Sequence, residues 1–259
     1  MSFYKNLSCF STMKNEIKIL YEDEDYVIVD KPPNVLTIPD RYDIFLPNLQ
    51  DILESKYKRI FIVHRLDKET SGIICFAKNE IAHKELVHQF FLRKVKKTYL
   101  AITQGRIDVK DGKIELPIAP DTNNPQKVKI DFVDGKPSIT EYKVIERFKN
   151  YTLVEAYPIT GRRHQIRIHF ATIGYPLLAD KLYSNTKEFY LSQIKKDYKF
   201  KKDEREKPLI SRTALHSYKI RFYHFRKKEF VELQCEPPKD FSLVLKYLRK
   251  YNNYHSQEI

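Results

Sequence analysis

Five ionisable side chains stand close together between two short apolar runs. They are His64, Arg65, Asp67, Lys68 and Glu69. The flanking runs, residues 61–63 and 73–77, are rich in β-branched and aromatic side chains, so they predict two buried strands joined by a sharp loop. Charges at the end of a buried strand cost free energy unless they pair or take part in a reaction. The segment is therefore either a surface hairpin with a local ion pair or part of a reactive site.

A second dense segment, residues 158–170, carries arginines and histidines close together. A helix that begins near Thr160 would place Arg163 and Arg167 on one face, whereas the alternation of apolar residues from Ile166 also suits a strand. Positive charge near a helix start opposes the helix dipole, so we expect an anionic partner. The alternative is a basic surface helix.

The rest of the chain predicts short strands and a few helices. We expect strands near residues 17–21, 26–30, 96–102, 114–118, 128–130, 139–148, 151–157 and 230–235, and helices near 47–57, 80–93 and 239–250. Asn79 is expected to cap the second helix, whose apolar stripe we predict to be core: Ile81, Ala82, Leu86, Val87, Phe90 and Phe91. Tight turns between the strands favour antiparallel pairing, which predicts an α+β fold.

We expect one catalytic domain over residues 16–250, between an N-terminal tail at 1–15 and a C-terminal tail at 251–259. A Lys-rich insertion at about 184–208 would be a helix or an irregular loop. The chain of 259 residues carries a net charge of +13, which predicts attraction to a polyanion.

The sequence has no apolar stretch long enough to span a bilayer, and its start lacks the apolar region of a signal peptide. We therefore expect nucleic acid, not a membrane, as the anionic partner. The alternative is a surface made basic by a Lys-rich composition. Cys9, Cys75 and Cys235 lack the spacing of metal ligands. An odd cysteine count without a secretory signal predicts a cytoplasmic protein.

The first segment matches H-R-L-D-x-x-T-S-G from His64 to Gly72, which resembles the signature of the RluA family of pseudouridine synthases. Three other segments match the family: 21–32, the K-x-Y-x-A element around Tyr99, and G-R-x-H-Q-I-R-x-H at 161–169. The chain departs from the family at Ala179, where a glycine is usual, and at Ser217, where an alanine is usual.

The resemblance implies a pseudouridine synthase fold: a mixed, mostly antiparallel sheet flanked by helices, with a central RNA-binding cleft. It also implies an isomerase that breaks the bond between uracil N1 and ribose C1′, turns the base and rejoins it through C5, without metal or other cofactor. Asp67 would be the nucleophile and Arg167 would keep it ionised. Tyr99 would stack on the uracil or remove a proton, and Arg65 would fill the gap left by the flipped base.

We further expect RNA contacts and a substrate pocket around these groups. The expected RNA-binding residues are His64, Arg65, Lys97, Arg162, Arg163 and His164, and the expected pocket residues are Leu66, Ile166 and Leu215. The substrate would be ribosomal or transfer RNA, and the protein a monomer. Two alternatives stay open: a non-catalytic RNA-binding ribosome-assembly factor, and a glycoside-cleaving enzyme with Glu69 as its second carboxylate.

Overall fold

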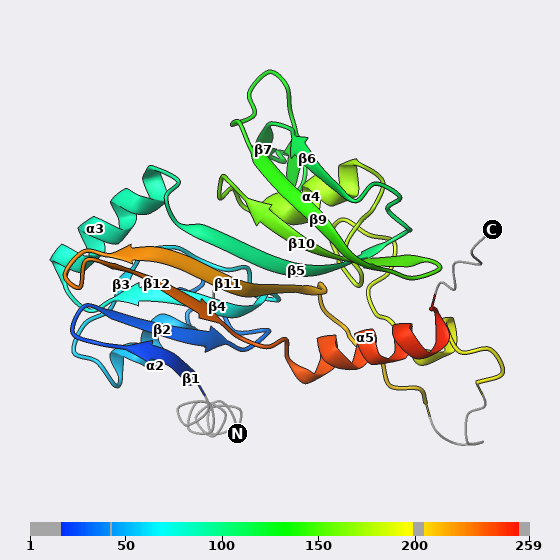
Figure 1. The fold of residues 1–259 in the computed structure, drawn as a ribbon, viewed down its shortest axis with the longest axis horizontal. Coiled ribbons are helices and arrows are strands. Elements are labelled where there is room, and N and C mark those ends of the chain that lie inside the picture. The colour runs from blue at the N-terminus through cyan, green and yellow to red at the C-terminus, as the bar shows by residue number, and fades with distance from the viewer. Residues whose placement is uncertain (1–16, 42, 199–204, 254–259) are drawn as a thin grey trace. The chain divides into compact units, whose positions relative to one another are not determined.

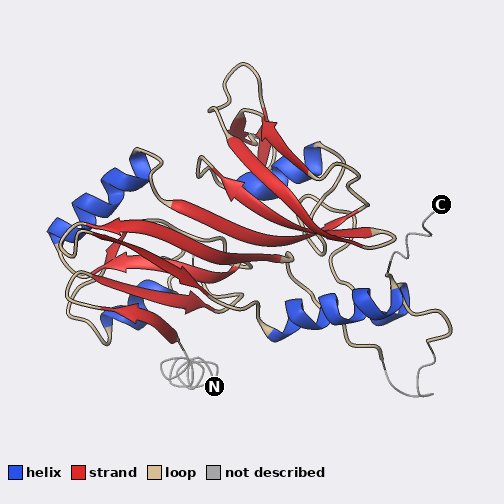
Figure 2. Ribbon diagram, viewed as in Figure 1, coloured by secondary structure: helices blue, strands red, loops and turns tan. Residues whose placement is uncertain are grey.

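The computed structural model describes residues 17–41, 43–198 and 205–253, and these form two compact units. The first unit contains residues up to Lys97 and the segment Ser217–Glu236, and the second contains Thr98–His216 and the chain from Pro237. Both units are built mainly from strands (Figure 2). The expected tail at 1–15 lies outside the described residues. No helix among the described residues is both long and apolar enough to cross a membrane.

In its described residues, the first unit combines a sheet with short helices (Figure 1). Its elements are β1 (Lys18–Glu22), β2 (Tyr26–Lys31), α2 (Leu49–Glu54), β3 (Phe61–Ile62), β4 (Ser71–Ala77), α3 (Glu80–Phe91), most of β11 (Leu215–His224) and β12 (Glu229–Gln234). The sheet runs β1-β2-β4-β11, with β3 added to β4 and β12 to β11. Every residue of β4 is buried, as its continuous apolar run predicts.

The second unit contains an antiparallel sheet in the order β5-β10-β9-β6 and a small β7-β8 pair. Its elements are β5 (Lys96–Gln104, from Thr98 on), β6 (Asp111–Glu115), β7 (Ile118–Pro120), β8 (Val128–Ile130), β9 (Ile139–Arg147), β10 (Tyr151–Pro158), α4 (Gln165–Thr172), η1 (Leu191–Gln193) and α5 (Lys239–Tyr251). The pairs β1-β2, β2-β4, β3-β4 and β11-β12 of the first unit and the pairs β5-β10, β9-β10, β6-β9 and β7-β8 of the second are antiparallel, which confirms the predicted, mostly antiparallel pairing.

The predicted cap of α3 is confirmed, but its predicted core stripe is partly wrong. The Asn79 side chain accepts a hydrogen bond of 2.9 Å from the Ala82 N–H group, which satisfies a free donor of the first turn. Ala82 and Leu86 are buried, whereas Ile81 is 61% exposed and Phe91 81% exposed. The helix thus covers its sheet with a narrower face than its apolar content suggests.

The second dense segment forms a helix, α4, and this settles the choice between helix and strand. It begins at Gln165, several residues later than expected, because His164 has a left-handed backbone with φ of 53°. Further on, Ala179 also has a positive φ, of 57°, and is fully buried. A glycine adopts this conformation without the strain that a Cβ atom brings. The backbone at position 179 therefore explains why a glycine is usual there.

The chain near the expected boundaries is anchored by specific contacts. In the Lys-rich insertion, Phe189 is buried, and its ring lies 5.3 Å from that of Tyr151. At the C-terminal end, α5 continues to Tyr251, and the Asn252 side chain accepts a hydrogen bond of 3.1 Å from the Asn150 N–H group. Residues 251–253 of the expected C-terminal tail are thus described, while residues 254–259 lie outside the described residues.

Candidate active site

Asp67 lies in the loop between β3 and β4, and the residue before it is clamped from both sides. The buried Thr37 hydroxyl donates to the Leu66 carbonyl at 3.0 Å and accepts from the Leu66 N–H group at 3.1 Å. One side chain thus satisfies both backbone groups of Leu66, which is itself buried. This pairing fixes the backbone just before Asp67.

The residue after Asp67 is held by a buried lysine. Lys31 has no exposed surface, and its ammonium group donates to the carbonyls of Lys68 at 3.0 Å, Val35 at 2.7 Å and Pro32 at 3.0 Å. The Asn34 N–H group donates to the same Lys68 carbonyl at 2.8 Å. Burying a charge is costly unless polar groups surround it, and here three carbonyls do so. The loop is therefore anchored on both sides of Asp67.

The turn that follows Asp67 depends on a glycine. The Thr70 N–H group donates to the Asp67 carbonyl at 3.1 Å. Gly72 has φ of 109°, and a Cβ atom there would lie 2.2 Å from the Ser217 carbonyl oxygen. The Ser217 hydroxyl in turn donates to the Ile73 carbonyl at 3.0 Å. A side chain at position 72 would clash with this neighbouring backbone, so the sharp turn into β4 requires glycine.

Three of the expected RNA-binding residues belong to the first unit. His64 stacks on Phe90 with ring centres 4.8 Å apart, and its Nε2 accepts from the Cys75 N–H group at 3.1 Å. Burial, with a smaller effect of Lys97, lowers the pKa of His64 to about 3, so its ring is neutral. Burial also lowers the pKa of Lys97 to about 8. Arg65 is exposed.

In the second unit, Arg167 is locked by a carboxylate that the sequence analysis did not assign. Arg167 Nε donates to Asp180 Oδ2 at 2.7 Å, and Nη2 donates to Oδ1 at 2.8 Å. Both side chains are buried. The N–H groups of Leu182 and Tyr183 also donate to Asp180 Oδ1. Such a two-pronged, charge-assisted pair fixes the plane of the guanidinium group.

Tyr183 joins the Arg167 helix to the β7-β8 pair. Its hydroxyl accepts from the Val128 N–H group at 2.8 Å and is hydrogen-bonded to His164 Nδ1 at 2.9 Å. Its ring centre lies 5.3 Å from the Arg167 guanidinium carbon. Nothing in the local sequence pattern marks Tyr183, because its partners come from two other segments.

The other basic residues before α4 differ in their surroundings. Arg163 Nη2 donates to the carbonyls of Pro125, at 2.9 Å, and Lys127. Arg162 is exposed, and its backbone N–H group donates to Gln165 Oε1 at 3.0 Å. Arg163 and His164 thus help to hold residues 125–128 and Tyr183 in place, whereas Arg162 faces solvent.

Tyr99 and the expected pocket residues are buried. Tyr99 lies on β5, opposite Ala156 of β10, and is 9% exposed. Leu66, Ile166 and Leu215 are each less than a tenth exposed. Asp67 and Leu66 belong to the first unit, and the other residues of this set belong to the second.

A protein-family model described as RNA pseudouridylate synthase matches residues 25–172, more than half of the chain. The chain belongs to this family. Members of the family are RNA pseudouridine synthases, which are isomerases, and this chain is one of them. The matched range contains Asp67, Tyr99 and Arg167. The resemblance that the sequence motifs indicated is therefore confirmed.

Curated relatives agree with this family over most of the chain. An RNA pseudouridine synthase of Aquifex aeolicus is 35% identical over 91% of this chain and 74% of its own length. The dual-specificity RNA pseudouridine synthase RluA of Pasteurella multocida is 32% identical over 85% of this chain and 93% of its own. Ribosomal large subunit pseudouridine synthase D of Neisseria meningitidis is 36% identical over 90% of this chain and 61% of its own.

Solved structures support the predicted fold class. Human RNA pseudouridylate synthase domain containing 4 has a TM-score of 0.68 and 22% identity, over 95% of this chain and 98% of that one. The human domain containing 1 protein has a TM-score of 0.66 and 24% identity, over 93% and 98% of the two chains. The pseudouridine synthase fold, with its mostly antiparallel strands and few helices, is thus confirmed.

Two residues named by the sequence motifs are held in place by their neighbours. The bonds to Leu66 and Lys68 restrict the backbone on both sides of Asp67. Asp180 fixes the orientation of the Arg167 guanidinium group. Within the part of the chain that the structure describes, no three side chains form a cluster of metal ligands.

Proposed function

We propose that this chain converts uridines of ribosomal or transfer RNA to pseudouridines, with Asp67 as the nucleophile. The observation that carries this proposal is the anchoring of the loop on both sides of Asp67, by Thr37 at Leu66 and by Lys31 and Asn34 at Lys68. A loop that served only as a surface turn would have no need of a fully buried lysine, whose burial is costly. The name of the Neisseria meningitidis relative specifies the ribosomal large subunit, which supports ribosomal RNA as a substrate. The name of the Pasteurella multocida relative specifies a dual-specificity RNA enzyme, which supports more than one RNA substrate.

In the proposed reaction, the carboxylate of Asp67 attacks the nucleotide or shields positive charge on the ribose while the N1–C1′ bond breaks. The uracil turns, a C5–C1′ bond forms, C5 loses its proton and N1 ends protonated, so that all atoms of the substrate stay in the product. We assign Arg167 the role of keeping Asp67 ionised. Tyr99 is assigned to the uracil, by stacking or by removing the C5 proton.

The remaining sequence-based expectations belong to the same proposal. Arg65, which is exposed, would replace the flipped base in its stack. We also predict that the protein is a monomer, that it acts in the cytoplasm and that it needs no metal or other cofactor.

The test is to incubate the purified protein with cellular RNA that lacks the modification and to map pseudouridine in the ribosomal and transfer RNA fractions separately. We expect discrete modified positions with the wild type and none with Asp67→Asn. RNA binding without any product would instead favour the ribosome-assembly factor. Release of free uracil would favour the glycoside-cleaving enzyme.

A further inference from the structure

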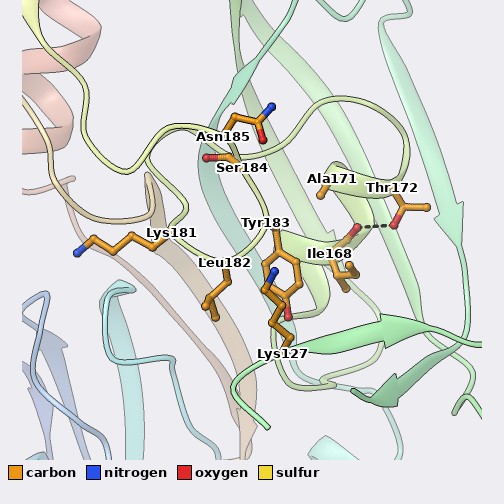
Figure 3. A pocket seen from close by; sticks show the side chains of 9 residues that line it. All are labelled: Lys127, Ile168, Ala171, Thr172, Lys181, Leu182, Tyr183, Ser184 and Asn185. Atoms are coloured by element: carbon orange, nitrogen blue, oxygen red, sulfur yellow. Dashed lines mark hydrogen bonds between the residues drawn. The ribbon is translucent and has the colours of Figure 1, made fainter. Parts of the chain in front are cut away.

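A polar groove in the second unit lies beside the helix that carries Arg167. It has a volume of about 490 Å³ and is lined by Lys127, Ile168, Ala171, Thr172, Lys181, Leu182, Tyr183, Ser184 and Asn185 (Figure 3). This volume is within the range of small-molecule sites, roughly 300–1,000 Å³. Tyr183, which lines the groove, has its ring centre 5.3 Å from the Arg167 guanidinium carbon.

The charge of the groove suits an anion. Among the described residues that line it, none is acidic, and two are lysines. The nearby Asp180 is fully buried and paired with Arg167, so its negative charge is compensated inside the protein. Lys127 lies along the Tyr183 ring, with 6.0 Å between its Nζ and the ring centre, whereas Lys181 extends away from the other lining side chains (Figure 3). Lys127 is therefore the cation placed to contact an anion in the groove.

The hydroxyl groups of the groove are arranged as acceptors. Thr172 Oγ1 donates its proton to the Ile168 carbonyl at 2.8 Å, so the oxygen of this exposed residue offers its lone pairs to a ligand. The single proton of the Ser184 hydroxyl is directed to carbonyls of its own loop, Asp180 at 2.9 Å or Thr186 at 2.7 Å, and the same oxygen accepts from the Thr186 N–H group at 3.2 Å. A ligand for this groove should thus combine an anionic group with a hydroxyl that donates.

We propose that this groove binds one ribonucleotide of the RNA strand next to the target uridine, with Lys127 on its phosphate and Thr172 accepting from its ribose 2′-hydroxyl. A phosphodiester supplies the anion, and the 2′-hydroxyl is the donor that distinguishes RNA from DNA. The assignment deepens the proposed function and rests on it. It makes the groove a site that selects for ribose at a position that does not react.

The test compares the binding of a short oligouridylate with that of its 2′-deoxy counterpart. Wild type should bind the RNA more tightly. Thr172→Val should lower the RNA-to-DNA affinity ratio by roughly 2- to 10-fold, the effect of one hydrogen bond, and should leave DNA affinity unchanged. Thr172→Ser keeps the acceptor and should restore the ratio. Thr122→Val, at an exposed threonine outside the groove, is the matched control and should have no effect.

Lys127→Ala tests the phosphate contact. It should weaken RNA and DNA alike and reduce the slope of log affinity against log salt by about one. Lys143→Ala removes an equal charge from an exposed position of β9 outside the groove and should leave the slope unchanged. Uridine 5′-monophosphate should not displace the oligouridylate at equal concentration. Displacement by the monophosphate would assign the groove to free nucleotides instead.

The proposal is overturned if wild type does not prefer the oligouridylate, if Thr172→Val keeps the wild-type ratio, or if Lys127→Ala behaves like Lys143→Ala. These measurements need no turnover. Failure of wild type to form pseudouridine would therefore contradict the proposed function and not the groove.

Discussion

At the scale of single residues, the position of Asp67 depends on backbone bonds made by its two neighbours. Thr37 serves both backbone groups of Leu66, and Lys31 and Asn34 converge on the Lys68 carbonyl. Arg167 depends in the same way on Asp180. In each case, a residue expected to act in the reaction is held by neighbouring residues, and we expect these neighbours to affect the reaction only through its position.

Thr37→Val tests this positioning in the first unit. Valine keeps the shape but leaves the Leu66 N–H and carbonyl groups buried without their partner, which costs about 1–3 kcal/mol. We expect that loss in urea unfolding, together with a fall in the single-turnover rate of pseudouridine formation that is larger than the fall in RNA affinity. Thr103→Val is the control, because the Thr103 hydroxyl makes one long bond of 3.4 Å far from Asp67 in sequence. Equal rates in the two variants would contradict the positioning role.

Lys97 predicts a pH dependence of stability. Its pKa is about 8 in the folded protein, below the ordinary value of 10.5, because of burial. Below pH 8, both folded and unfolded chains carry the proton, and burial of the charge destabilises the fold. Between pH 8 and 10.5 the unfolded chain binds more protons, so stability rises with pH.

Lys97→Met should therefore be more stable than wild type by about 1–3 kcal/mol at pH 7, and this advantage should shrink as the pH rises toward 10.5. Urea unfolding of both proteins across this range measures the difference. Lys143→Met, at an exposed position, should show a difference that does not vary with pH. A constant difference for Lys97→Met would show that the pKa of Lys97 is not lowered.

At the scale of elements, local signals predicted most strands and the ends of some helices. Asn79 caps α3 as expected, because capping involves residues a few positions apart. The sequence of α3 does not predict which part of its apolar stripe is buried, because tertiary packing decides this and leaves Ile81 and Phe91 exposed. The spacing of apolar residues after Thr160 fits a helix and a strand equally well. No local sequence signal marks the left-handed backbone of His164, after which α4 begins.

Gly72 provides a test of how an element begins. Gly72→Ala places a Cβ atom 2.2 Å from a backbone carbonyl at the start of β4, as well as straining a positive φ. We expect a loss of at least about 3 kcal/mol in the free energy of unfolding. Gly174→Ala is a matched control, because Gly174 has φ of 87° with nothing within 4 Å of the added atom. It should cost only the backbone strain, about 1–2 kcal/mol. Equal losses would mean that the approach of β11 does not require glycine at position 72.

At the scale of the whole chain, motifs identified the family, and the comparisons confirmed it. Asp67, Tyr99 and Arg167 could be named from these motifs because each lies in a run of matched residues. Thr37, Asp180 and Tyr183 could not be assigned roles from local patterns, because their contacts join segments 13 or more positions apart: 29 for Thr37 and Leu66, 13 for Asp180 and Arg167, and 55 for Tyr183 and Val128. The net charge of +13 agreed with an RNA substrate but did not indicate where RNA binds.

The central claim is that Asp67 carries out the chemistry, and single-turnover pseudouridine formation by Asp67→Asn tests it most directly. The rate should fall at least about 1,000-fold, as expected for loss of a nucleophile, while RNA affinity stays at the wild-type level. Glu69→Gln, which removes a carboxylate two residues away, should keep the wild-type rate. An Asp67→Asn protein that forms pseudouridine as fast as wild type would contradict the account.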